Sequence, residues 1–329
     1  MMTEFNPKVS IIIPVYNGAN YLREAIDSAL TQTYQNFEVI VINDGSNDEG
    51  STDRIALSYG RKIRYFKKDN GGVGSALNYG IDKMEGDYFS WLSHDDLYDP
   101  RKIQTQIDLI RKANDKYIIP YSCIEYIDSK SLPLHRKEII PIDYRKMKYA
   151  LITNSPIHGC TLLIHKKVFE TIGNFNQDLV TAQDYDLWFR IAEKFQFLYM
   201  PDILVKARLH VQQGTITIPS YQHEQAEFFI QCLKKIPPEE LKYLSNAVSI
   251  ASAYVKLSIM YKRRIVSKAS LYASNQAKRF LKYDQGATFV KNCVLIVYCD
   301  TLNFLFSLLN RFGYSRKSRI DRHIRLSKK

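Results

Sequence analysis

Apolar runs and amphipathic stretches alternate along the first third of the chain. Four short apolar runs each predict a buried strand, and they cover residues 9–14, 38–43, 63–67 and 88–92. Helical periodicity follows these runs over about residues 21–31, from residue 51, and up to about residues 84 and 114. This alternation predicts an α/β fold with an open, mainly parallel sheet and helices on both faces.

Polar residues mark the expected starts of two of these helices. Asn20 is placed to cap the first helix, and Asp99 followed by Pro100 is typical of an N-cap with proline in the first turn. Later in the chain, short strands are mixed with helices predicted at about residues 144–153, 166–172 and 185–194.

The pattern changes near residue 221, after which the sequence predicts helices with few strands. We therefore expect an α/β domain over residues 1–220 and a helical region over residues 221–329. The second region contains 20 Lys and Arg but only 7 Asp and Glu, while the 329-residue chain has a net charge of +12. This uneven charge suggests a polyanionic partner for the helical region, either nucleic acid or an anionic membrane.

The cysteines and the N-terminus bear on the cellular compartment. The five cysteines are scattered and form no CxxC pair, which favours free thiols over disulfides or a zinc site. The residues before position 8 lack the apolar core of a signal peptide. We therefore expect the α/β domain to lie in the cytoplasm.

Several polar residues follow directly after predicted strands. Asn17, Asp44 and the pair Asp95 and Asp96 all do so, and in an open α/β sheet such positions share one rim where ligands bind. Two adjacent carboxylates after a buried strand suggest a hard divalent cation that also contacts phosphate. The alternative is that Asp95 and Asp96 form an exposed turn and that Asp44 forms an Asx turn.

Three further segments carry candidate chemistry. Asn70 and Gly71 begin a glycine-rich loop before a helix, where backbone approaches a ligand closely, but the loop is neither a P-loop nor a dinucleotide-binding fingerprint. Asp184 precedes an amphipathic helix and is either a general base or only a helix cap. His210 is either a phosphate or metal contact on a lid or an ordinary lone histidine.

Taken together, these segments resemble the family 2 inverting glycosyltransferases, which have a GT-A fold. The resemblance covers about residues 8–215 and rests on the order and spacing of the segments. They are Pro14-Val-Tyr-Asn17, Asn43-Asp-Gly-Ser46, Asn70-Gly-Gly-Val-Gly-Ser-Ala-Leu-Asn78, Gly86-Asp-Tyr88, Ser93-His-Asp-Asp96 and Gln183-Asp184 before Asp186-Leu-Trp188.

The resemblance implies a nucleotide-sugar donor, with uracil as the expected base. Asp44 would bind the base, Asp95 would lie near the ribose, and His210 would lie on a loop that closes on the diphosphate. The residues expected to contact the donor are Pro14, Val15, Asn17, Asp44, Asn70, Gly71, Asp95 and His210.

The resemblance also implies the metal site and the catalytic base. Asp96 would bind Mn²⁺ or Mg²⁺, which neutralises the leaving diphosphate, and Asp184 would deprotonate the acceptor hydroxyl. Two positions depart from the usual family pattern. Ser93 stands where the metal motif often begins with Asp, and Gln183 stands where the base is often preceded by Glu.

The end of the helical region combines an apolar stretch with a basic tail. Residues 290–312 are rich in Val, Leu, Ile and Phe, but Asp300 and Asn303 interrupt them, so a membrane span is disfavoured. Eight Lys and Arg follow between residues 311 and 329. This pattern predicts a membrane-surface anchor over residues 290–329, with a buried packing helix as the main alternative.

The sequence therefore predicts a sugar transferase for cell-surface polysaccharide or glycolipid synthesis, working in the cytoplasm or at the inner face of the cell membrane. Its expected partners are a nucleotide-sugar donor and a saccharide or lipid-linked saccharide acceptor. Two other functions remain open: a nucleotidyltransferase acting on sugar phosphates, and a non-enzymatic nucleic-acid binder. A nucleotidyltransferase would need a basic glycine-rich signature near the first strand, and this sequence has none there. A nucleic-acid binder would need a stacking aromatic surface among its basic residues, which the sequence does not show, so no nucleic acid is expected.

Overall fold

A computed structural model describes residues 5–154 and 156–311, and these residues form two compact units. The first, here called the sheet unit, comprises residues up to Tyr144 together with Pro156–His210. The second, here called the helical unit, comprises residues 145–154 and those from Val211 onward. The prediction placed segments 145–154 and 211–220 in the first domain, whereas the structure places them in the helical unit.

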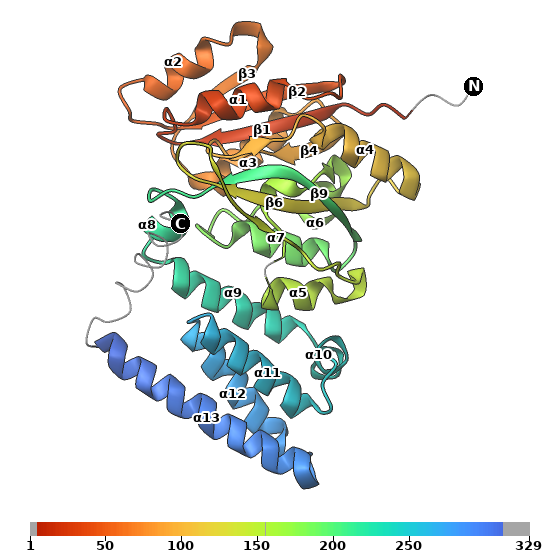
Figure 1. The fold of residues 1–329 in the computed structure, drawn as a ribbon, viewed down its shortest axis with the longest axis vertical. Coiled ribbons are helices and arrows are strands. Elements are labelled where there is room, and N and C mark those ends of the chain that lie inside the picture. The colour runs from red at the N-terminus through yellow and green to blue at the C-terminus, as the bar shows by residue number, and fades with distance from the viewer. Residues whose placement is uncertain (1–4, 155, 312–329) are drawn as a thin grey trace. The chain divides into compact units, whose positions relative to one another are not determined.

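A five-stranded sheet forms the core of the sheet unit (Figure 1). Its four parallel strands lie in the order β3, β2, β1, β4, and the short β8 pairs antiparallel with β4. Every residue of β1 is buried, which explains its continuous apolar run. The strands are β1 (Val9–Val15), β2 (Phe37–Asp44), β3 (Arg64–Lys68), β4 (Tyr88–Trp91) and β8 (Ile164–His165).

Helices follow the parallel strands, as the alternating pattern predicts, and the expected α/β fold is confirmed. Amphipathic α3 packs on β1 and β2, with its small residues toward the sheet. The helices after the first four strands are α1 (Leu22–Leu30), α2 (Ser51–Leu57), α3 (Gly72–Lys83) and α4 (Lys102–Ala113).

The two predicted helix caps have different outcomes. Tyr21, not Asn20, occupies the N-cap position of α1. The regular part of α4 begins after Arg101, two residues later than predicted. The Asp99 carboxylate accepts from the N–H of Arg101 and its carbonyl accepts from the N–H of Lys102, so Asp99 caps the turn that leads into α4.

A second sheet of four strands lies in the sheet unit, in the order β5, β9, β6, β7. The long strands β6 and β9 are parallel, and the outer strands are antiparallel to their neighbours. The sequence indicated short strands here but not their assembly into a sheet. These strands are β5 (Leu97–Tyr98), β6 (Ile119–Ile127), β7 (Pro133–Lys137) and β9 (Phe197–Arg208), and the remaining helices are α6 (Lys166–Ile172) and α7 (Gln183–Ile191).

The described residues of the helical unit form helices only, in line with the predicted helical region. Helices α11, α12 and α13 pack on one another, and α5 packs on α11. No helix in the described residues is both long enough and apolar enough to cross a membrane. The helices are α5 (Met147–Thr153), α8 (Gly214–Thr217), α9 (Tyr221–Lys235), α10 (Pro238–Leu244), α11 (Ile250–Arg263), α12 (Ser267–Leu281) and α13 (Gly286–Arg311).

Candidate active site

The ends of parallel β1, β2 and β4 place the first candidate residues on one rim of the sheet. The register pairs Val15 with Asn43, so the two strands end side by side. Asn17 then adopts a left-handed conformation with φ of 49°, and its N–H donates to Ser46 Oγ over 2.9 Å. This contact joins the loop after β1 to the loop after β2.

Pro14 and Val15 lie at the buried end of β1. Val15 is only 2% exposed, and Pro14 is also buried. The side chains of these two residues, which the sequence predicted to line the nucleotide pocket, are therefore packed in the core.

Asp44 organises the glycine-rich loop. It is 3% exposed, and its carboxylate accepts from the N–H of Gly71 at 3.1 Å and from the N–H of Gly72 at 2.7 Å. Lys68 Nζ donates to the same carboxylate over 2.7 Å, and Asn70 Nδ2 donates to the Asp44 carbonyl over 2.9 Å. The structure thus brings together Asp44, Asn70 and Gly71, which the sequence proposed separately.

Asp95 is paired with His210. The distance between His210 Nε2 and Asp95 Oδ2 is 2.9 Å, although the two residues are 115 positions apart. Burial raises the pKa of Asp95, but the hydrogen bond from His210 and the nearby charges of His94 and His210 outweigh it, so the pKa is lowered overall. Asp95 is therefore held ionised.

Asp96 lies deeper and has different partners. It is 4% exposed, and its Oδ1 accepts from the N–H of Arg208 over 2.9 Å. Its Oδ2 accepts from Cys160 Sγ over 3.3 Å and lies 3.8 Å from His158 Nε2. Burial and the charge of Asp95 raise the pKa of Asp96 well above its ordinary value.

Asp96, His158 and Cys160 form a group of potential metal ligands. One ligand atom from each lies within 4.8 Å of the others. His158 Nδ1 is buried, and no partner among the described residues hydrogen-bonds it. A cation beside Asp96 would offset the repulsion from Asp95, so these residues fit a divalent ion. The oxygen of Asp96 suits Mn²⁺ and Mg²⁺, whereas a nitrogen or sulfur ligand is a poor match for Mg²⁺.

Asp184 lies in the first turn of α7, because this helix begins at Gln183, two residues earlier than predicted. The beginning of α7 lies beside two parts of the site. A Cβ on Gly74, in the first turn of α3, would lie 3.5 Å from Gln183 Cγ, and Tyr185 Oη donates to the Ile157 carbonyl over 2.8 Å. Because α3 follows the glycine-rich loop and Ile157 precedes His158, the start of α7 lies next to the segments that carry both groups.

Sequence reasoning missed four residues of this region: Lys68, His158, Cys160 and Arg208. Arg208 is fully buried, donates to the Asp95 carbonyl over 2.8 Å, and stacks over the Tyr21 ring at 4.2 Å. The one available signal was an arginine at the end of an apolar strand. His158 and Cys160 lie in a stretch without strong periodicity, so nothing local marked them.

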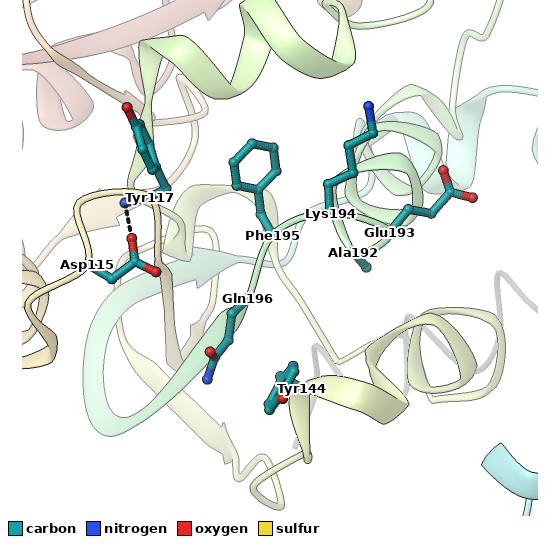
Figure 2. A pocket seen from close by; sticks show the side chains of 8 residues that line it. All are labelled: Asp115, Tyr117, Tyr144, Ala192, Glu193, Lys194, Phe195 and Gln196. Carbon is teal, nitrogen blue, oxygen red and sulfur yellow. Dashed lines mark hydrogen bonds between the residues drawn. The ribbon is translucent and has the colours of Figure 1, made fainter.

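A cavity of about 470 Å³ lies elsewhere in the sheet unit (Figure 2). Figure 2 shows the rings of Tyr117 and Phe195 on one side of it and Tyr144 on another. It is located where β6 and β9 begin, whereas Arg208 lies at the far end of β9. None of the predicted site residues lines this cavity.

Comparisons with known proteins find a matching family model and similar chains. The family model described as glycosyl transferase family 2 matches residues 10–173. An uncharacterized glycosyltransferase of Rickettsia typhi is 50% identical over 243 residues, which cover 72% of this chain and 75% of the relative. A Rickettsia felis relative with the same description is also 50% identical, over 238 residues that cover 71% of this chain. This chain spans only 40% of the length of that second relative.

Among solved structures, residues 1–349 of Staphylococcus aureus TarS, in complex with UDP-GlcNAc, are similar with a TM-score of 0.58 at 16% sequence identity. The match covers 82% of this chain and 88% of the TarS chain. At this identity the likeness shows the fold alone.

Proposed function

The chain belongs to glycosyl transferase family 2, and we propose that it is a metal-dependent, inverting glycosyltransferase that uses a UDP-sugar donor. The observations that support this proposal are contacts between the segments that carry three acidic residues. Asp44 holds the glycine-rich loop, and Gln183, next to Asp184, lies beside Gly74 of α3, which follows that loop. Tyr185 of the same helix contacts the segment of His158 beside Asp96.

The donor would be held by the rim of the sheet. The nucleoside would lie near Asn17 and Asp44, and the ribose near Asp95, which His210 orients. The choice of UDP is supported by the structural neighbour, which is a complex with UDP-GlcNAc. Because Asp44 is 3% exposed and already accepts from Gly71, Gly72 and Lys68, it would act on the nucleoside chiefly through the glycine-rich loop that it holds in place.

Asp96 would hold a divalent ion, Mn²⁺ or Mg²⁺, with His158 and Cys160 beside it. Such an ion, when bound, stabilises the negative charge that develops on the departing diphosphate. The chain itself positions the Asp96 carboxylate through the N–H of Arg208, which fixes one oxygen and leaves the other directed at the ligand group.

Asp184 would act as the general base. Its Oδ1 accepts from the N–H of Tyr185 over 2.7 Å, which holds the carboxylate at the start of α7. It would take the proton of an acceptor hydroxyl as that oxygen attacks the anomeric carbon, in one displacement with inversion. Gln183 is neutral, so the negative charge that often precedes the base in the resembled family is missing at this position.

We propose a saccharide or lipid-linked saccharide acceptor and a role in cell-surface polysaccharide or glycolipid synthesis, on the cytoplasmic side of the membrane. Family membership supports sugar transfer over the two alternatives, the nucleotidyltransferase and the nucleic-acid binder. The released product distinguishes sugar transfer from nucleotidyl transfer, because a glycosyltransferase releases a nucleoside diphosphate and a nucleotidyltransferase releases pyrophosphate.

A thermal-shift screen of nucleotide sugars, with and without Mn²⁺, tests the proposal. The correct donor at about 100 times its Kd should stabilise the protein by about 2.7 kcal/mol. Most of that stabilisation should vanish after chelation of the metal, and also in the Asp96→Ala variant. The proposal would be wrong if no UDP-sugar stabilised the wild type.

The control for this experiment is Asp108→Ala, which removes an exposed carboxylate that pairs only with neighbouring surface groups on α4. It should keep the full metal-dependent shift. Equal metal-dependent shifts in Asp96→Ala and Asp108→Ala would contradict the assignment of Asp96.

A further inference from the structure

Three polar side chains of helix α13 are bonded within the helical unit. Asn292 is 2% exposed and donates to Ser252 Oγ of α11 over 2.9 Å. Asp300 accepts from Ser274 Oγ of α12 over 2.7 Å, and its other oxygen pairs with Lys278 at 2.6 Å. Asn303 accepts from Lys262 Nζ over 3.1 Å. Asp300 and Asn303, the two residues that disfavour a membrane span in the sequence, are therefore hydrogen-bonded to neighbouring helices.

The opposite side of α13 is apolar and exposed. Val290, Val294 and Val297 are 61%, 63% and 65% exposed, and Tyr298 beside them is 54% exposed. At 100° per residue the three valines fall within about 60° around the helix axis, so they form one stripe. We call these four residues the outward face of α13.

The buried side of α13 also carries Ile296 and Cys299, so the helix is apolar on both sides, whereas a helix on the surface of a globular protein usually exposes a polar side. Branched apolar side chains in a continuous exposed stripe are typical of an interaction site. Helix α13 is not apolar over a long enough stretch to span a bilayer. The exposed valines therefore suit a helix that lies flat on an apolar layer.

The charge of the helical region indicates which kind of partner covers the outward face of α13. Residues 221–329 carry 20 Lys and Arg against 7 Asp and Glu. Lys291 is exposed next to the stripe, and the sequence continues into the basic tail, whose residues 312–329 lie outside the described part of the chain. An apolar stripe on a unit with a net basic charge is complementary to lipid acyl chains beneath anionic headgroups, whereas nucleic acid would leave the valines uncovered.

We propose that the outward face of α13 is a membrane-surface binding site, which rests on an anionic lipid layer with the helix axis in the plane of that layer. The site extends the proposed function, because a lipid-linked acceptor lies at the same surface. Its contacts are nevertheless separate from the candidate active site, since they come from the helical unit alone.

Vesicle flotation of the full chain tests the site. Wild type should float with phosphatidylcholine vesicles that contain phosphatidylglycerol, and should bind pure phosphatidylcholine vesicles much more weakly. Val294→Glu combined with Val297→Glu should lower binding to the anionic vesicles about tenfold or more, because it places charge in the apolar stripe. The matched control is Val248→Glu, at a valine of the same unit that is 75% exposed but lies before α11. It should bind as wild type.

Tyr298→Trp gives a second readout that does not depend on a loss of vesicle binding. Tyr298 is half-exposed, and its tryptophan replacement should shift its emission to the blue when anionic vesicles are added. Wild-type protein that fails to float, equal losses for the double variant and the control, or an unshifted Tyr298→Trp spectrum would each overturn the proposal. Concentration-dependent dimerisation that the double variant abolishes would instead identify a second copy as the occupant.

The same variants separate this site from the proposed function. The Val294 and Val297 double variant should retain metal-dependent donor binding in the thermal-shift assay, whereas Asp96→Ala should lose it and still float. A protein that binds the donor but does not float would contradict only the membrane site. A protein that floats but does not bind a donor would contradict only the transferase assignment.

Discussion

Two adjacent aspartates of this chain have opposite electrostatic surroundings. Asp95 faces His210 and has a lowered pKa, while Asp96 lies against Cys160 and the Arg208 backbone and has a raised pKa. The sequence could predict that both carboxylates follow a strand. It could not predict which one is held ionised, because the deciding partners come from distant parts of the chain and meet only through the second sheet.

Replacement of Asp184 by Asn should abolish the general base without removing the side chain. We expect kcat/KM for sugar transfer to fall by about 10²–10⁴, with an unchanged melting temperature, because only proton acceptance is lost. Steady-state kinetics and a thermal melt measure the two effects.

The matched control is Asp186→Asn on the same helix. Asp186 pairs with Arg190 at 2.9 Å, so this variant should lose some stability and keep its turnover. Similar turnover in Asp184→Asn and wild type would exclude Asp184 as the base.

Lys102 should make stability depend on pH. It is fully buried, donates to Ser90 Oγ over 2.7 Å and to Gln106 Oε1 over 3.0 Å, and burial lowers its pKa to about 7. Between about pH 7 and the ordinary lysine pKa near 10.5, the unfolded chain binds a proton that the folded chain does not. Stability from this group therefore rises with pH across that window.

Thermal melts from about pH 7 to pH 10 check this expectation. Lys102→Met should lose the rise, while Lys112→Met, an exposed position on the same helix, should keep it. A wild-type curve parallel to that of Lys102→Met would show that Lys102 does not titrate in this range.

At the scale of elements, local patterns predicted the helices and parallel strands well, and long-range pairing poorly. Helix α6 (Lys166–Ile172) has the predicted bounds, because its periodicity is contained in its own sequence. The sheet of β5, β9, β6 and β7 joins segments up to about a hundred residues apart, and no local signal specifies such partners. That sheet brings Arg208 to the rim, so the missed sheet also explains why this residue was missed.

Two glycines of α3 should respond differently to alanine. A Cβ on Gly80 would lie 2.5 Å from Ile12 Cγ2 in the buried β1, so Gly80→Ala should destabilise the protein by about 1–3 kcal/mol. A Cβ on Gly74 would meet Gln183 at an ordinary 3.5 Å, and Gly74→Ala should be neutral or stabilising by up to about 1 kcal/mol. Urea denaturation measures both, and equal effects would show that helix propensity, not helix–strand contact, sets the stability here.

For the whole molecule, the sequence predicted an α/β part followed by a basic helical part, and the structure contains both kinds of unit. Composition changes near residue 221 and so indicated the second part. It could not indicate that residues 145–154 pack with the later helices, because α5 looks like any other amphipathic turn of the first part. The exposed valines of α13 were also hidden, since hydropathy does not tell which side of a helix faces the protein.

The membership of α5 in the helical unit has a consequence for how the protein is made. Arg264 donates to the Thr153 carbonyl over 2.6 Å, and these residues are 111 positions apart. On the ribosome, α5 therefore emerges long before the helices that cover its buried Met147 and Leu151. A polypeptide that ends after β9 would expose this uncovered helix to chaperones and proteases. The sheet unit therefore cannot be obtained as an intact fragment by a single truncation.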